Sequence, residues 1–159
     1  MRTRSKTTKF IMGAILAAGG MQAYIAAADQ NAQQGVETRQ HNLKELGGAF
    51  KEVRDQLRKP QPDMAAVTQA SGKIDQLVAQ MHTWFPAGSG PAKGIETDAK
   101  PEIWSDPQGF SAALTKLKTE APKLHTFAKA NDVDGLKKQV GAVGGACKGC
   151  HDKYRVPEE

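Results

Sequence analysis

The chain has 159 residues, which is enough for one modest domain, and 25% of them are charged. Its formal net charge is +5, but four of the 22 basic residues lie close to the N-terminus, namely Arg2, Arg4, Lys6 and Lys9. Without these four, 18 basic residues remain against 17 acidic ones, and no basic stripe with interleaved aromatics is present. The charge balance therefore argues against a nucleic-acid-binding protein.

The first 28 residues have the order of features of a secretory signal peptide. A basic segment is followed by an apolar stretch at about residues 10–25 and then by the alanines 26–28, which fit a signal-peptidase site. Two glycines and a glutamine interrupt the apolar stretch, so it is a poor membrane-spanning helix. We expect export to the periplasm, cleavage before Asp29, and a mature domain over residues 29–159 without membrane insertion. An uncleaved anchor is the alternative.

Apolar residues recur at helical spacing in four stretches of the mature chain. The stretches run from about Ala32 to Arg58, from about Asp63 to Thr83, from Pro107 to Ala128, and from after Asp132 to Pro157. Asp106 is a good N-cap, and Pro107 suits the first position of the third helix. The apolar stripe of this helix is formed by Phe110, Leu114, Leu117, Ala121, Leu124 and Ala128. No strand-like alternation of useful length occurs. The pattern predicts an all-α fold, an antiparallel four-helix bundle.

A cysteine motif lies near the end of the fourth predicted helix, with the sequence Cys147-Lys148-Gly149-Cys150-His151. This C-x-x-C-H spacing is the attachment signature of c-type haem. Two thiols one helical turn apart can reach two neighbouring vinyl groups, and the adjacent histidine can offer a neutral imidazole nitrogen to iron. The motif predicts one covalently bound haem c, with Cys147 and Cys150 as thioether residues and His151 as the axial iron ligand.

Three other roles are open to two cysteines at this spacing. A thioredoxin-like redox pair would need a βαβ context, which the predicted elements lack. A structural zinc site would need a second pair of cysteine or histidine ligands. A disulfide is common in exported proteins, but closing so short a loop adds little stability. The adjoining histidine, the helical context and the predicted export favour haem.

The whole mature chain resembles the class II cytochromes, specifically the cytochrome c′ family. The matching motifs are Arg39-Gln40-x-x-Leu43, Lys100-Pro101-Glu102-Ile103-Trp104-Ser105-Asp106, and Cys147-x-x-Cys150-His151-x-x-Tyr154-Arg155. In low-spin relatives of the cytochrome c-556 type, a methionine stands four residues after the arginine and supplies the sixth iron ligand. Here that residue is Leu43, which has no lone pair. The resemblance therefore implies a five-coordinate iron with Leu43 over its distal face.

The resemblance also implies further residues at the haem. Arg39 and Gln40 would lie at the haem edge, with Arg39 as the partner of a propionate. By itself, the position of Arg39 in the apolar stripe fits either a side chain that reaches water or one paired with an anion. Glu96 and Thr97 fall in a loop that lines the haem in this family. Arg155 is either a residue flanking the axial histidine or a solvated helix-end arginine.

The remaining histidines and methionines carry weaker signals. His41, His82 and His125 are predicted to be surface or partly buried residues rather than iron ligands. Met64 and Met81 fit the core stripe of the second helix.

These observations together predict a periplasmic high-spin c-type cytochrome that binds NO and CO, transfers electrons, or does both. The alternative is a plain low-potential electron carrier of a periplasmic redox chain, similar to cytochrome c-556. A haem peroxidase would need a distal acid–base residue where Leu43 stands, so we expect no enzyme. The family resemblance further suggests a homodimer, and Ala49 with the Gly47-Gly48 pair would allow close helix approach.

Overall fold

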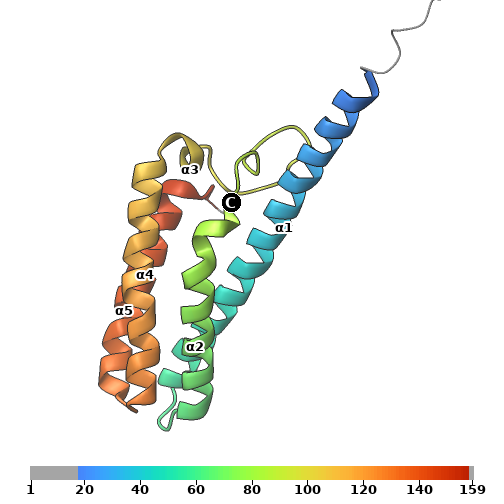
Figure 1. Ribbon diagram of the computed structural model, residues 1–159. Helices are drawn as coiled ribbons and strands as arrows, with labels where there is room; N and C mark the ends of the chain where they lie inside the picture. The colour runs from blue at the N-terminus through green and yellow to red at the C-terminus, as the bar shows by residue number, and fades with distance from the viewer. Residues whose placement is uncertain (1–17, 158–159) are drawn as a thin grey trace, which may run out of the picture.

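The computed structural model describes the backbone of residues 18–157 and the side chains of residues 30–157 (Figure 1). The predicted signal peptide, residues 1–28, lies outside the residues whose side chains are described, and its cleavage stays a prediction. The elements in chain order are α1 (Ala18–Leu57), α2 (Met64–Gln80), the 3-10 helix η1 (Met81–Trp84), α3 (Glu102–Ser105), α4 (Pro107–Lys129) and α5 (Val133–Tyr154).

The four long helices α1, α2, α4 and α5 run alternately in opposite directions (Figure 1), which confirms the predicted all-α bundle. The predicted start of the first helix at Ala32 was wrong, because α1 already begins at Ala18. That prediction followed the apolar stripe, whereas the alanine-rich segment ahead of it contains no proline and continues the helix. No helix within the described part of the chain is long and apolar enough to cross a membrane.

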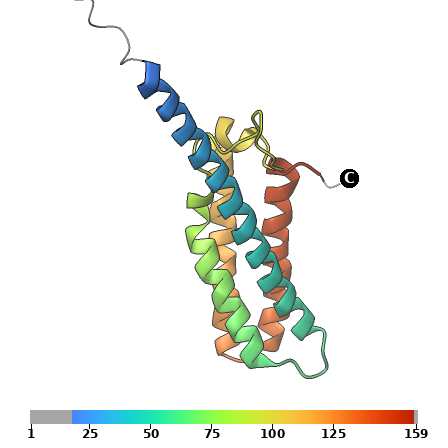
Figure 2. The same ribbon diagram turned by 90° about the vertical axis from the view of Figure 1, so that its right-hand side faces the viewer.

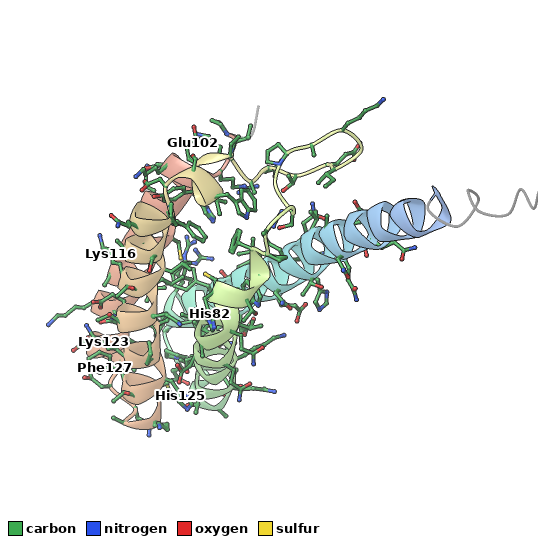
Figure 3. All side chains as sticks on the ribbon, turned by 45° about the horizontal axis from the view of Figure 1, so that its top comes forward. His82, Glu102, Lys116, Lys123, His125 and Phe127 are labelled. Carbon is green, nitrogen blue, oxygen red and sulfur yellow. The ribbon has the colours of Figure 1, made fainter. Side chains whose placement is uncertain are left out.

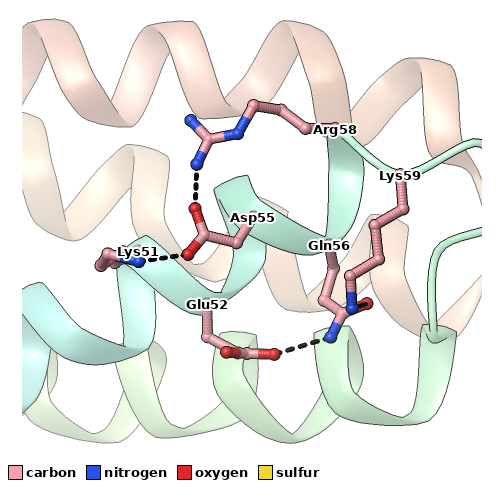
Figure 4. A network of polar contacts seen from close by, with 6 residues as sticks. All are labelled: Lys51, Glu52, Asp55, Gln56, Arg58 and Lys59. Carbon is pink, nitrogen blue, oxygen red and sulfur yellow. Dashed lines mark hydrogen bonds and ion pairs between the residues drawn. The ribbon is translucent and has the colours of Figure 1, made fainter.

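The turn between α1 and α2 is fixed by polar contacts (Figure 4). The buried Gln56 side chain donates to Glu52 Oε1 at 2.7 Å, and its own oxygen accepts from Lys59 Nζ at 3.0 Å and from the backbone N–H of Asp63 at 3.1 Å. Asp55 forms ion pairs with Lys51 and Arg58 on the neighbouring surface. These contacts replace the backbone hydrogen bonds that end with α1 and bring α2 back against it.

Aspartate side chains cap the first turns of α4 and α5, and the cap of α4 is the one that the sequence predicted. Asp106 Oδ1 accepts from the backbone N–H of Gly109 at 3.0 Å, and Pro107 is the first residue of α4. Asp132 caps α5 in the same way through Gly135 at 2.8 Å. The predicted α4 stripe is buried along its length: Phe110, Leu114, Leu117, Ala121, Leu124 and Ala128.

The helices are not packed equally around the bundle. α2 has extensive contacts with α1 and α4, and α4 with α5, whereas α1 and α5 share few contacts. Figure 2 shows α1 crossing the bundle at an angle to α5. The apolar stripes of α1 and α5 therefore do not close directly on each other.

Candidate functional site

A cavity of about 520 Å³ occupies the space between α1 and α5. Its size is within the range of ligand and cofactor pockets, about 300–1,000 Å³. Most of its wall is apolar and comes from every long helix, with Leu43, Leu46, Phe50, Ile74, Met81, Phe85, Ile103, Phe110, Leu114, Leu117 and Val143 among the lining residues. The cavity is thus part of the core that no side chain fills.

The cysteine motif lies on the α5 wall of this cavity. Cys147, Cys150 and His151 all line it, and the two cysteines are half-buried free thiols rather than a disulfide. Burial raises the pKa of the Cys147 thiol. Burial, with a smaller effect of the neighbouring Cys147, raises the pKa of Cys150 to about 11. Both thiols are therefore neutral at pH 7 and open toward the cavity.

The end of α5 is held in place by contacts with α4 and the preceding loop. Tyr154 donates through its hydroxyl to Asp106 Oδ2 at 3.2 Å, and its carbonyl accepts from the N–H of Lys100 at 2.9 Å. Lys153 forms an ion pair with the same Asp106 carboxylate at 2.7 Å. The Lys153 contact, the Gly109 N–H and the Tyr154 hydroxyl lower the pKa of Asp106. This arrangement fixes the helical turn that carries His151.

Arg155 lies just beyond the axial histidine candidate and also lines the cavity. Its guanidinium is 3.6 Å from the carboxylate of Asp98, and its backbone forms an isolated bridge with Ala99. The loop before α3 is thereby joined to the end of α5.

The wall opposite the cysteines is formed largely by α1. Leu43 is half-buried and lines the cavity, as do Gln40, Lys44 and Gly47. Of two aromatics at the end of η1, Phe85 lines the cavity, whereas Trp84 is buried and does not. Met81 was expected to be a core residue, and it is both buried and part of the cavity wall. Its position in the apolar stripe does not tell a core residue from a residue that lines a cavity.

Arg39 lies in the cavity wall where α1 meets the long loop. Its side chain is only 2% exposed, and it donates to Ser89 Oγ at 2.9 Å and to Thr97 Oγ1 at 2.9 Å. Thr97 also lines the cavity, whereas Glu96 does not. The Glu96 carbonyl instead accepts from the Gln40 side chain at 3.3 Å. Sequence reasoning missed Ser89, because a lone serine in a glycine- and proline-rich loop carries no pattern.

The other histidines lie away from this cavity. His41, His82 and His125 are not among its lining residues. Figure 3 labels His82 beside the end of α2 and His125 on α4. The His125 Nδ1 atom is 3.3 Å from Ser71 Oγ, so this histidine belongs to the contact between α2 and α4.

These residues fit a covalently held haem. The cavity is large and apolar, two thiols and an imidazole share one wall, and a buried cation stands at its edge. The cysteine motif is not joined by further zinc ligands: the described residues contain no cluster of three or more histidine, cysteine or acidic side chains that could hold a metal ion. The fold and the site therefore define a c-type haem protein built on a helical bundle.

Comparison with known proteins gives the family. Residues 34–155 match the family described as cytochrome C′. A cytochrome c′ of Rubrivivax gelatinosus is 48% identical over 68 residues, which are 43% of this chain and 53% of that protein. A cytochrome c′ of Alcaligenes xylosoxydans xylosoxydans is 32% identical over 123 residues, which are 77% of this chain and 94% of that protein.

Solved structures agree with the sequence matches. A ferrous variant of the Alcaligenes xylosoxidans protein with bound NO superposes with a TM-score of 0.72 at 29% identity, over 80% of this chain and 97% of that one. The chain belongs to the cytochrome c′ family, as its motifs predicted, and its cofactor is haem c.

Proposed function

We propose that this cytochrome c′ is a periplasmic high-spin haem protein that binds NO and CO and transfers electrons. In this proposal Cys147 and Cys150 hold the haem by thioether bonds, and His151 is the sole protein ligand to iron. The observation that supports it is that Leu43 of α1 and His151 of α5 line one cavity from different helices. When bound, the haem supplies an iron that exchanges one electron and takes up small neutral ligands.

Leu43 determines what can enter the free side of the site. Its hydrocarbon side chain has no lone pair, so it cannot act as a ligand, and its bulk restricts the space to small molecules. Leu43, Phe50 and Ile74 offer no hydrogen-bond donor to a polar ligand such as O₂. NO and CO need no such donor and are therefore the favoured ligands. The NO-bound structure of the Alcaligenes xylosoxidans relative is consistent with this choice.

Adding NO to the reduced holoprotein tests the proposal. Micromolar NO should shift the Soret band of the unaltered protein. Leu43→Met should convert the protein to a low-spin form and slow the NO reaction, because it places a thioether where the leucine stands. Leu57→Met is the matched control, since Leu57 is buried on the same helix but does not line the cavity. No Soret shift in the unaltered protein would reject NO binding.

A low-spin electron carrier is the second candidate, and one observation favours it. Met81 lines the cavity and carries a soft thioether that could serve as a second axial ligand. Met81→Leu separates the two candidates. The high-spin proposal predicts an unchanged ferric spectrum, whereas the low-spin candidate predicts loss of a methionine–iron charge-transfer band.

We propose a carrying and ligand-binding role rather than an enzymatic one. A peroxidase needs an acid–base residue beside the iron. In this proposal Leu43, which lines the cavity from α1, occupies that position. Steady-state peroxide turnover should therefore stay near that of free haem peptide. Turnover far above that level would reject this part of the proposal.

We also propose a homodimer formed through the α1–α2 face. A groove of about 340 Å³ on this face is lined by the small residues Gly48, Ala49, Ala66 and Ala70 and flanked by charged ones. Gly47 lines the haem cavity instead. Light scattering at tens of micromolar should give a dimeric mass, and Ala66→Arg should give a monomeric one. A monomeric mass for the unaltered protein would contradict the dimer.

Export is proposed from the leader sequence. Mass spectrometry of the protein recovered from the periplasm should give a chain that starts at Asp29 and carries the added mass of one haem. A chain that retains residues 1–28 in the membrane fraction would support the uncleaved anchor instead.

A further inference from the structure

Arg39 is a buried cation held entirely by neutral groups. Its Nη1 atom donates to Ser89 Oγ at 2.9 Å and to the Trp84 carbonyl at 3.4 Å. Its Nη2 atom donates to the Ser89 carbonyl at 3.0 Å and to Thr97 Oγ1 at 2.9 Å. None of these four acceptors carries a charge. The hydrogen bonds orient the guanidinium but do not neutralise it.

The surroundings of Arg39 supply no counter-charge. Within residues 30–157, no carboxylate forms an ion pair with it. The Phe85 and Trp104 rings lie 5.1 and 5.8 Å from its Cζ atom and give further contacts on the ring faces. Burial lowers the pKa of Arg39, but an arginine stays protonated in proteins. The charge is therefore permanent, desolvated and uncompensated by the chain.

The position of Ser89 explains how the chain keeps this charge in place. Ser89 is fully buried, and its hydroxyl donates to the Pro86 carbonyl at 2.9 Å while it accepts from Arg39. Gly35 makes room for this contact on α1, since a Cβ there would lie 2.7 Å from Pro86 Cγ and 3.3 Å from Ser89 Cβ. The loop is thus closed onto α1 around the guanidinium.

We infer that Arg39, positioned by Ser89 and Thr97, raises the reduction potential of the haem. The inference rests on the haem lying in the cavity that Arg39 lines. Reduction adds one electron, supplied in a titration by a dye mediator, and makes the contents of the cavity one charge more negative. A fixed cation in a poorly solvated wall stabilises that state over the oxidised one.

The test is the midpoint potential of purified holoprotein variants, measured by spectroelectrochemical titration. Arg39→Met should lower the ratio of reduced to oxidised protein at a fixed ambient potential by about tenfold, which is about 59 mV for a one-electron couple. Arg39→Lys keeps the positive charge, so its midpoint potential should lie close to that of the unaltered protein. Arg54→Met removes the same charge from the surface of the same helix and should change the ratio less than twofold.

A second pair of variants tests the inference even if the Arg39→Met variant does not fold. Thr97→Asp places a carboxylate beside the intact guanidinium and should lower the ratio severalfold, whereas the neutral Thr97→Asn should have a smaller effect. Equal shifts in Arg39→Lys and Arg39→Met, or in Thr97→Asp and Thr97→Asn, would overturn the inference, because packing rather than charge would then set the potential. The spin state of the unaltered protein tests the proposed function separately.

Discussion

The contact between α2 and α4 and the space between α1 and α5 are built from similar sequence patterns but have opposite outcomes. Val67 and Val78 of α2 and Leu124 of α4 are at most 1% exposed and do not line the cavity. On the other side, Leu43, Phe50, Cys147 and Cys150 occupy equivalent stripe positions and remain half-buried around a cavity. One pair of helices fills its interface with side chains, and the other pair leaves its interface for a cofactor.

This difference shows how a functional part of an apolar stripe can be told from a purely structural part. Protein interiors are close-packed, so a cavity of about 520 Å³ costs stability unless a ligand fills it. The covalent attachment motif stands on the helix that borders this cavity. The tightly packed side therefore acts as the scaffold, and the open side acts as the site.

The largest expected effect comes from removing the attachment residues. Replacing both Cys147 and Cys150 by alanine should abolish covalent haem, because no other cysteine is present in the chain. Mass spectrometry under denaturing conditions should then give the mass of the polypeptide alone. Haem that stays attached through denaturation in this variant would contradict the assignment of the thioether residues.

One leucine-to-alanine change in the α2–α4 contact and one in the cavity wall should affect different properties, stability in the first case and NO binding in the second. Leu124→Ala should lower the free energy of unfolding by about 2–5 kcal/mol, because it empties a close-packed position. Leu43→Ala should cost less than Leu124→Ala, because Leu43 is only half-buried, and should raise the NO association rate severalfold, because the leucine lines the cavity. Guanidinium unfolding and stopped-flow mixing measure the two effects. A Leu43→Ala variant with unchanged NO kinetics would break the comparison.

A smaller effect is expected where the loop meets α1. Gly35→Ala should lower stability by about 1–3 kcal/mol, because the added Cβ would lie 2.7 Å from Pro86 Cγ. Gly141→Ala on α5 is the control, since a Cβ there meets nothing within 4 Å and Gly141 lines neither the cavity nor the groove. If thermal unfolding finds both variants equally stable, the loop is not packed on α1 as described.

The smallest effect concerns acid stability. The pKa of Asp106 is lowered, mainly by Lys153, so its contribution to stability is complete above its unfolded pKa of about 4 and is lost as pH falls through the lower folded value. Asp106→Asn keeps a capping side chain but removes this titration, so its unfolding free energy should fall less steeply below about pH 4. Equal slopes for Asp106→Asn and the unaltered protein would contradict the assignment.

The sequence was sufficient for the fold and the attachment motif. The α4 stripe predicted every buried position from Phe110 to Ala128, and the cap at Asp106 followed from residue type alone. Apolar periodicity and helix capping depend on residues close together in the sequence, so they can be predicted without knowledge of the tertiary structure.

The cavity and the loop contacts could not be predicted in the same way. Met81 lines the cavity because α1 and α5 share few contacts, which is a property of helix packing rather than of the segment that carries Met81. The contact between Ser89 and Arg39 joins residues 50 positions apart through an irregular loop. The start of α1 was also missed, because the predicted signal peptide and the helix share alanine-rich sequence.

The electron paramagnetic resonance spectrum of the ferric holoprotein tests the central claim most directly. If His151 is the only protein ligand and Leu43 leaves the other side of the iron open, the spectrum should be high-spin at neutral pH, and Met81→Leu should not change it. A low-spin spectrum in the unaltered protein would contradict the account, and loss of that spectrum in Met81→Leu would identify Met81 as the missing ligand.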